Sequence, residues 1–237
     1  MNKLIIQIMA SFIFNKQKRK EFRRKYKPAK IVGKDNKIYV GQKEVFAVPN
    51  LEISINGNGN IIRIPENHQV TGSISIKSSE SLIDIKSTKK VNIFVSTIFQ
   101  TGQKLLIDED TIIHGAHIFL HEKDASVIIG KDCLFSGNIT IWATDGHAIL
   151  DNNTGKILNP ITQPIIINDH CWCGSNVFMT KNTFLGKNSI IGGGSVVTKS
   201  FSNENVIIAG NPAKIIKENI TWKHETVAQL LINRTSK

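Results

Sequence analysis

Residues 165–199 read IIINDHCWCGSNVFMTKNTFLGKNSIIGGGSVVTK, and an apolar residue returns at every sixth position of this stretch. The repeated positions are Ile167, Cys173, Met179, Leu185, Ile191 and Val197. The same spacing occurs upstream, at Ile129, Phe135 and Ile141. A period of six fits neither a helix nor an isolated strand, which repeat about every 3.6 and about every 2 residues. It is typical of a parallel β-helix with triangular coils, each side about one hexapeptide long, so we expect an all-β fold.

The repeat stops between residues 142 and 166, and this interruption contains the candidate catalytic residues. Trp142, Asp145 and His147 occur there, and Gly146 permits a sharp turn of the backbone. An unperturbed imidazole, with a pKa of about 6.5, can take a proton from an alcohol near neutral pH. Asp145 is near enough to orient a neighbouring imidazole, including one on another chain. From these residues alone, a general base and a loop histidine without a role are equally good interpretations.

Residues 1–28 are expected to form a basic, amphipathic helical segment. Ile5, Ile8, Met9 and Phe12 make an apolar stripe at helical spacing. Residues 1–30 contain ten Lys and Arg against one acid, Glu21, and so supply nine of the eleven net positive charges of the chain. Two alternatives stay open, namely contact with an anionic membrane surface and packing within an assembly of this chain. No nucleic-acid motif accompanies the charge, so we expect no nucleic-acid partner.

The apolar run at residues 4–14 is followed by basic residues and not by a cleavage site for a signal peptidase. A run of this length is also too short to span a hydrocarbon layer of about 30 Å. We therefore expect a cytoplasmic protein, with the inner membrane surface as the alternative location for a peripheral contact.

The remaining chain divides into three predicted parts. Residues 29–124 are expected to form irregular early coils, because short strands recur about every 10 to 13 residues and run on into the hexapeptides. An antiparallel sandwich is the alternative interpretation of that region. Residues 125–214 are expected to form the regular β-helix, with residues 148–164 as an extruded loop. Residues 215–237 are expected to form a C-terminal helix and tail, with a helix at 215–231 capping the open edge.

Five spaced motifs together carry a resemblance to a known family. They are residues 145–147, the Asn159-Pro160 turn, and residues 165–175, 192–199 and 209–214. In this order they resemble the left-handed β-helix acyltransferases, the hexapeptide-repeat family, over residues 125–220. Within that family they are most similar to the O-acetyltransferases of bacterial capsule and lipopolysaccharide sugars. The resemblance implies a left-handed helix, a homotrimer with active sites between subunits, and acetyl-CoA as co-substrate.

The resemblance also implies roles for individual residues. His147 takes the position of the catalytic base, and residues 148–164 match an arm that reaches towards a neighbouring subunit. Trp172 takes the position beside the reactive end of coenzyme A and the acceptor, and Trp142 is a second candidate for acceptor contact. The positions that match the coenzyme A groove are Trp172, Ser175, Gly193, Thr198, Lys199, Pro212 and Lys214. The family's Val-Trp-Ile-Gly is Cys-Trp-Cys-Gly at residues 171–174, and Asn168 replaces its usual Gly.

Two groups of residues suggest a metal, and we expect none. Cys133, Cys171 and Cys173 fall on inward positions of the repeat, where they fit as small core residues. A rival interpretation is zinc on His114, His117 and His121, because some parallel β-helices are carbonic anhydrases that hold zinc on three histidines. Strand alternation and a coil bend would spread these three side chains, whereas zinc ligands converge at about 2.1 Å. Surface histidines, or a contact with an acceptor sugar, fit better.

The predicted function is acetyl-CoA-dependent O-acetylation of a bacterial surface polysaccharide, with direct transfer to a sugar hydroxyl. The basic N-terminal segment favours an anionic or membrane-proximal polymer such as a capsule. Two alternatives remain: an N-acetyltransferase of a nucleotide-linked amino sugar, and a glycan-binding trimer without catalysis.

Overall fold

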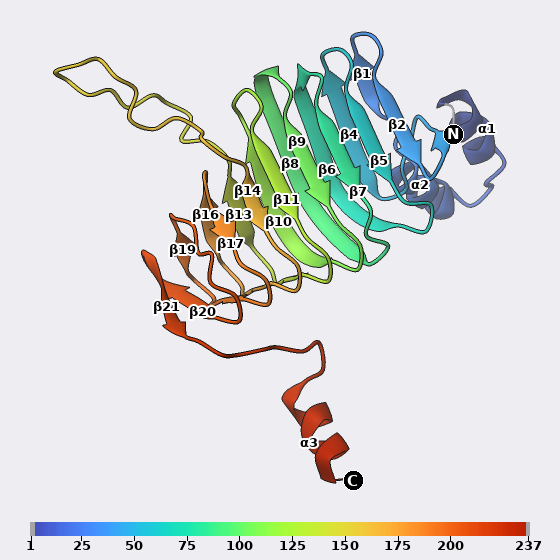
Figure 1. The fold of residues 1–237 in the computed structure, drawn as a ribbon. Helices are drawn as coiled ribbons and strands as arrows, with labels where there is room; N and C mark the ends of the chain where they lie inside the picture. The colour runs from blue at the N-terminus through green and yellow to red at the C-terminus, as the bar shows by residue number, and fades with distance from the viewer. Residues whose placement is uncertain (1–2, 236–237) are drawn as a thin grey trace.

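The hexapeptide repeat folds as predicted, into a parallel β-helix of about eight turns (Figure 1). The computed structural model describes residues 3–235. All nine repeat positions named above are fully buried, and one continuous apolar cluster runs along the axis of the coils. Side chains alternate between inward and outward along each strand, which explains the core, and each side of a coil is about one hexapeptide long, which explains the period of six.

The strands form two sheets along the helix. Within the described part of the chain, the first contains β1 (Lys30–Val32), β4 (Leu51–Asn56), β6 (Gln69–Ser79), β8 (Lys90–Thr101), β10 (Ile112–Leu120), β12 (Leu134–Phe135), β13 (Ile139–Trp142), β15 (Trp172–Cys173), β16 (Phe178–Thr180), β18 (Ile190–Ile191), β19 (Val196–Val197), β20 (Ile207–Gly210) and β21 (Ala213–Lys217). The second contains β2 (Lys37–Val40), β3 (Lys43–Glu44), β5 (Ile61–Ile64), β7 (Leu82–Ile85), β9 (Lys104–Ile107), β11 (Ser126–Ile129), β14 (Ile165–Ile167) and β17 (Phe184–Leu185).

Three ladders of strands make the three sides of the later coils. Beyond β10 the first sheet divides, because β10 pairs with β12 through residues 112–113 and with β13 through residues 116–119. One ladder then runs β12–β15–β18–β20, and a second runs β13–β16–β19. The third ladder is β11–β14–β17. This division decides which functional side chains share a side of the molecule.

Asparagine and aspartate hold many of the corners between these ladders. Asn138, Asn176, Asn182 and Asn188 all have φ between 53° and 61°. Asn and Asp tolerate this left-handed conformation better than other residues with a Cβ atom. The corners therefore turn sharply without a glycine at each position.

The early coils belong to the same solenoid and are not a sandwich. The pairs β1–β4, β4–β6, β6–β8 and β8–β10 are parallel, and so are β2–β5, β5–β7 and β7–β9. Two of these strands are much longer than any later one, since β6 has 11 residues and β8 has 12.

The helical segment expected over residues 1–28 is divided into two helices. They are α1 (Lys3–Ser11) and α2 (Lys16–Lys25), and Asn15 caps α2 by accepting a hydrogen bond from the Lys18 amide at 3.0 Å. Residues 1–2 lie outside the described residues. Ile6 and Ala10 are buried, whereas Ile8 and Phe12 of the predicted stripe are exposed. The stripe is therefore the uncovered face of α1.

The predicted C-terminal helix is present, but it does not occupy residues 215–231, and a strand takes the capping position that was expected for it. Residues 213–217 form β21, which pairs antiparallel with β20 and so covers the open edge of the last coil. The β-branched pair Ile215 and Ile216 favours this extended conformation. The C-terminal helix α3 begins later (Val227–Thr235) and exposes Val227, and residues 236–237 lie outside the described residues. None of the helices within 3–235 is long and apolar enough to cross a bilayer.

Candidate active site

The loop that carries His147 leaves the coil after β13 and returns at β14 (Figure 1, yellow). Gly146 turns with φ of +77°, and its amide donates to the Thr144 hydroxyl at 2.9 Å. Asn159 closes the base of the loop, because its side chain donates to the His147 carbonyl at 2.9 Å and accepts from the Ile149 amide at 2.7 Å. Beyond this point the loop forms a hairpin through an antiparallel bridge between Leu150 and Ile157.

His147 itself is exposed, at the edge of a cleft of about 330 Å³. Residues lining the cleft include Glu122, Lys123, Asp145, Asn159 and Pro160. Among residues 3–235, no group hydrogen-bonds the His147 imidazole. Both ring nitrogens are therefore available to a substrate.

Asp145 braces the loop and does not contact the imidazole of His147. Its carboxylate pairs with the Lys181 ammonium and accepts a hydrogen bond from the Asn159 amide at 2.8 Å. The Lys181 hydrogen bond is the main cause that lowers the pKa of Asp145 below its ordinary value, and partial burial opposes it. In a single chain the predicted orienting role of Asp145 therefore has no imidazole partner, and it stays a prediction for an imidazole of another chain.

Trp142 belongs to an aromatic cluster on the outer face of β8, β10 and β13. Its ring stacks on Phe119 with 4.5 Å between centroids, and His121 meets it edge-on at 5.7 Å. His121 also contacts the Ser96 hydroxyl at 3.0 Å, and burial lowers the pKa of His121. His117 stacks instead on Phe94 at 4.7 Å. In the part of the chain that the structure covers, no three His, Cys, Asp or Glu side chains group as metal ligands.

Trp172 lies on a different side of the coil from His147. It is on β15, in the ladder of β12 and β18, and its side chain is 37% exposed. The indole nitrogen faces the Ser136 hydroxyl at 3.4 Å. His147 follows β13, which belongs to the other ladder of that sheet. One chain alone therefore does not bring the predicted base and the predicted tryptophan onto one ladder.

The predicted coenzyme A positions also lie on two different ladders of one chain. Ser175 and Gly193 meet where successive coils approach closely, since the Gly194 amide donates to the Ser175 carbonyl at 2.9 Å. Pro212 and Lys214 are exposed around the turn that joins β20 to β21, next along this ladder. Thr198 and Lys199, also exposed, follow β19 in the ladder of β13 and β16. Their roles as coenzyme A contacts stay predictions.

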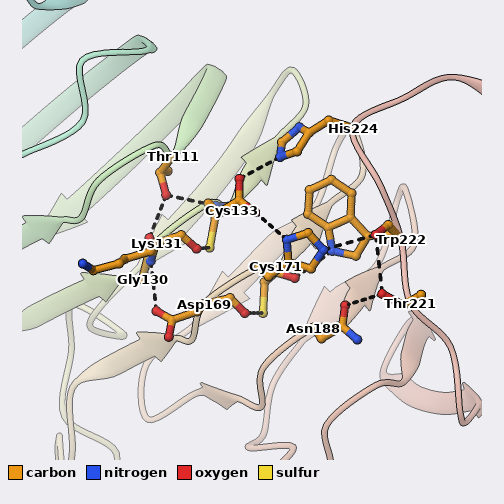
Figure 2. Close-up of polar contacts among 12 residues, drawn as sticks. Thr111, Gly130, Lys131, Cys133, Asp169, Cys171, Asn188, Thr221, Trp222 and His224 are labelled. Atoms are coloured by element: carbon orange, nitrogen blue, oxygen red, sulfur yellow. Dashed lines mark hydrogen bonds and ion pairs between the residues drawn. The ribbon is translucent and has the colours of Figure 1, made fainter.

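One cluster was missed by the sequence analysis. His170 and His224 both face the carboxylate of Asp132, at 2.7 and 2.9 Å, and His170 stacks on the buried ring of Trp222. Figure 2 labels Trp222 and His224 of this cluster. These residues lie far apart along the chain. The available signal was His170 itself, which occupies a corner position where neighbouring coils have Asn or Asp.

The chain is similar in sequence to known polysialic acid O-acetyltransferases. No family model matches the chain. It is 45% identical over 130 residues to a polysialic acid O-acetyltransferase of Escherichia coli O1:K1, covering 55% of this chain and 41% of that protein. The chain thus spans less than half of that relative's length. It is 34% identical over 172 residues to a polysialic acid O-acetyltransferase of Neisseria meningitidis, covering 72% of this chain and 79% of that protein.

Two solved structures share the fold along most of their length. The polySia-specific acetyltransferase NeuO has 30% identity and a TM-score of 0.69, with coverage of 88% of this chain and 94% of that one. The polysialic acid O-acetyltransferase OatWY has a TM-score of 0.70 at 24% identity, with coverage of 88% and 97%.

Proposed function

This chain belongs to the polysialic acid O-acetyltransferase family, and we propose that it transfers an acetyl group from acetyl-CoA to a hydroxyl of an anionic capsule polysaccharide. The observation that supports this most directly is the exposed imidazole of His147 at the edge of a cleft, on a loop braced by Asp145, Lys181 and Asn159. A base that must meet a polymer hydroxyl has to be accessible, and a braced loop keeps it in one place.

The proposed reaction is a direct transfer with His147 as general base. The neutral imidazole takes the proton of the sugar hydroxyl while the hydroxyl oxygen forms a bond to the carbonyl carbon of the thioester. The carbon–sulfur bond then breaks, and the proton passes from His147 to the sulfur of coenzyme A. A backbone N–H in the cleft would stabilise the oxyanion of the tetrahedral intermediate.

A homotrimer would bring the two halves of the site together. His147, Thr198 and Lys199 lie on one side of the coil, and Trp172 lies on the next. If both halves contact one coenzyme A, the second half has to come from a neighbouring chain. The hairpin of residues 148–164 suits such a contact, because Ile149, Leu150, Ile157 and Leu158 are all exposed on it. The exposed ammonium groups of Lys199 and Lys214 would pair with phosphates of coenzyme A.

The test is acetyl transfer to purified polysialic acid, with the ester detected by mass spectrometry and by its lability in base. We expect His147→Ala to lower turnover by ~10²–10⁴-fold, the usual size of general-base catalysis. His68→Ala is the matched control, since His68 lies just before β6 in an early coil, has no role in the proposed site and should leave turnover unchanged. Near-normal turnover of His147→Ala would contradict the proposed base. Acetyl transfer to nucleotide-linked amino sugars only, or glycan binding without transfer, would favour the two alternative functions.

We also propose that the N-terminal helices bind an anionic membrane surface, which implies a cytoplasmic enzyme at the inner leaflet. Helix α2 contains seven Lys and Arg and one Glu. Beside it, α1 and its following turn expose Ile8, Phe12 and Phe14, the last being 92% exposed. A soluble polyanion would need the charges alone, whereas a membrane surface uses charges and apolar side chains together.

Co-sedimentation with vesicles separates these partners. We expect binding to vesicles containing phosphatidylglycerol and little binding to vesicles of phosphatidylcholine alone. Phe12→Ser with Phe14→Ser should weaken the binding, and Val227→Ser, a similarly exposed apolar position in α3, should not. Equal binding by all of these variants would point to charge alone. A loss of trimer in the Phe variants would instead place α1 in the subunit contact.

A further inference from the structure

Residues 218–226, here called the strap, run back along one corner of the solenoid after β21. That corner is a column of stacked residues, one from each coil: Asp132, His170, Asn188 and Asn205. All four have left-handed backbone conformations, with φ between 53° and 59°. The strap therefore crosses coils that were completed much earlier in the sequence.

The strap contacts each corner residue in turn. The Ile220 amide donates to the Asn205 carbonyl at 3.0 Å, and the Thr221 hydroxyl donates to the Asn188 side chain at 3.0 Å. Two further contacts follow along the column, and Figure 2 labels the strap residues that make them, Trp222 and His224. The Trp222 indole nitrogen donates to the His170 carbonyl at 2.7 Å, and the His224 Nε2 meets the Asp132 carboxylate at 2.9 Å.

Trp222 is the most deeply held residue of the strap. Its side chain is only 6% exposed, and its ring lies nearly parallel to His170, with 4.3 Å between centroids and 12° between planes. The ring of His170 is held in place as well, because its Nδ1 lies 2.7 Å from the carboxylate of Asp132. The other three positions of the column are Asp132, Asn188 and Asn205. None of these side chains has a ring, so only the imidazole of His170 offers a surface on which Trp222 can stack.

This packing reaches the tryptophan of the proposed site. Trp172 follows His170 by two residues, so both side chains point outward from the same side of the coil. The ring of Trp222 lies 6.0 Å from the ring of Trp172, tilted by 43°. Trp172 is thus flanked by Trp222 and by the Ser136 hydroxyl, and it remains 37% exposed to solvent.

We propose that the strap is part of the active cleft and that Trp222 is a positioning residue for Trp172. This inference rests on the proposed function, in which Trp172 contacts coenzyme A and the acceptor. Removing the Trp222 ring leaves Trp172 without a wall on one side, so its indole samples more orientations. A loss of binding shared by ground state and transition state raises KM and leaves kcat largely unchanged. Since Trp222 does not contact His147, the pH profile should keep its shape.

Two readouts test the proposal on the full-length protein. In the Trp142→Phe background, Trp172 is the only fluorescent tryptophan once Trp222 is replaced, because the chain has three tryptophans. We expect Trp222→Ala to raise acrylamide quenching of Trp172 about twofold over Trp222→Phe, which keeps an aromatic wall. With Trp142 intact, Trp222→Ala should raise the KM for acetyl-CoA about tenfold. The KM of Trp222→Phe should stay close to the wild-type value.

His170→Asn is a second variant that removes the stacking surface without straining the corner, because Asn tolerates this conformation. It should move both readouts in the same direction as Trp222→Ala. Val227→Ser, which follows the strap in α3, should move neither. The proposal is overturned if Trp222→Ala and Trp222→Phe have equal quenching and equal KM. It is also overturned if kcat and thermal stability fall in Trp222→Ala while KM is unchanged. If the wild-type protein transfers no acetyl group, the proposed function fails, and the quenching comparison still decides the role of the strap.

Discussion

The ion pair between Asp145 and Lys181 should stabilise the loop that carries His147, and Lys181→Met tests this. The Lys181 side chain is 12% exposed and the Asp145 side chain is 36% exposed, so solvent weakens the pair but does not cancel it. Measured values for exposed pairs are about 0.2–1 kcal/mol, and we take the upper end for this geometry. Asp145→Ala also removes the hydrogen bond from Asn159, which adds about 0.5–1.5 kcal/mol.

Hydrogen exchange of the loop amides, read by mass spectrometry, measures this opening free energy. A cost of about 1 kcal/mol in Lys181→Met corresponds to about fivefold faster exchange of residues 146–160, and about 2 kcal/mol in Asp145→Ala to about thirtyfold. Transfer activity should fall by no more than these factors, because the braced conformation stays accessible. Lys86→Met, which removes another surface ion pair (to Asp108), is the control and should not change exchange in the loop.

The pH dependence of the loop follows from the lowered pKa of Asp145. A carboxyl whose folded pKa is depressed contributes its full stability above the unfolded value of 3.8, and loses it as pH falls through the lower folded pKa. The loop should therefore stay braced throughout the neutral range. A different result would contradict the bracing role: turnover that falls by ~10²-fold or more in Asp145→Asn and stays normal in Lys181→Met. In that case the carboxylate of Asp145 orients an imidazole.

Three further predictions concern catalysis, packing and the core. Transfer activity should decline at acidic pH, because a general base has to be neutral to accept the proton, and a pH–rate profile measures this. Gly174→Ala should destabilise the fold by about 1–3 kcal/mol in urea unfolding, because its Cβ would lie 2.6 Å from the Gly193 backbone nitrogen; Gly137→Ala, with no atom within 4 Å, should be neutral. The three cysteines should not react with a disulfide reagent until the protein unfolds, since all are buried and burial raises the pKa of the Cys173 thiol.

The match between sequence and structure was best where contacts repeat and poorest at the two ends. Phe135 and Ile191 are core residues as predicted, because the same inward position recurs in every coil and one strand specifies it. Ile215 was placed in a helix, but the unpaired edge of β20 was available to it and its β-branched side chain suits a strand. The helical spacing of apolar residues in α1 was predicted from the sequence. The spacing did not indicate that Ile6 and Ala10 would be the buried residues of this helix.

The amino-acid sequence by itself determined the solenoid, the interruption that carries His147, and the membership of an acyltransferase family, because each of these depends on local periodicity or on a contiguous motif. The tertiary structure alone decided which side chains meet. Asp145 pairs with a lysine 36 positions away, His170 contacts Trp222 across 52 positions, and Asp132 meets His224 across 92. The stacking of the coils sets these pairs, and neither the six-residue repeat nor any single motif contains the register between one coil and another. The same stacking places His147 and Trp172 on different ladders, which is why the arrangement of a complete site is a property of the folded chain and its assembly.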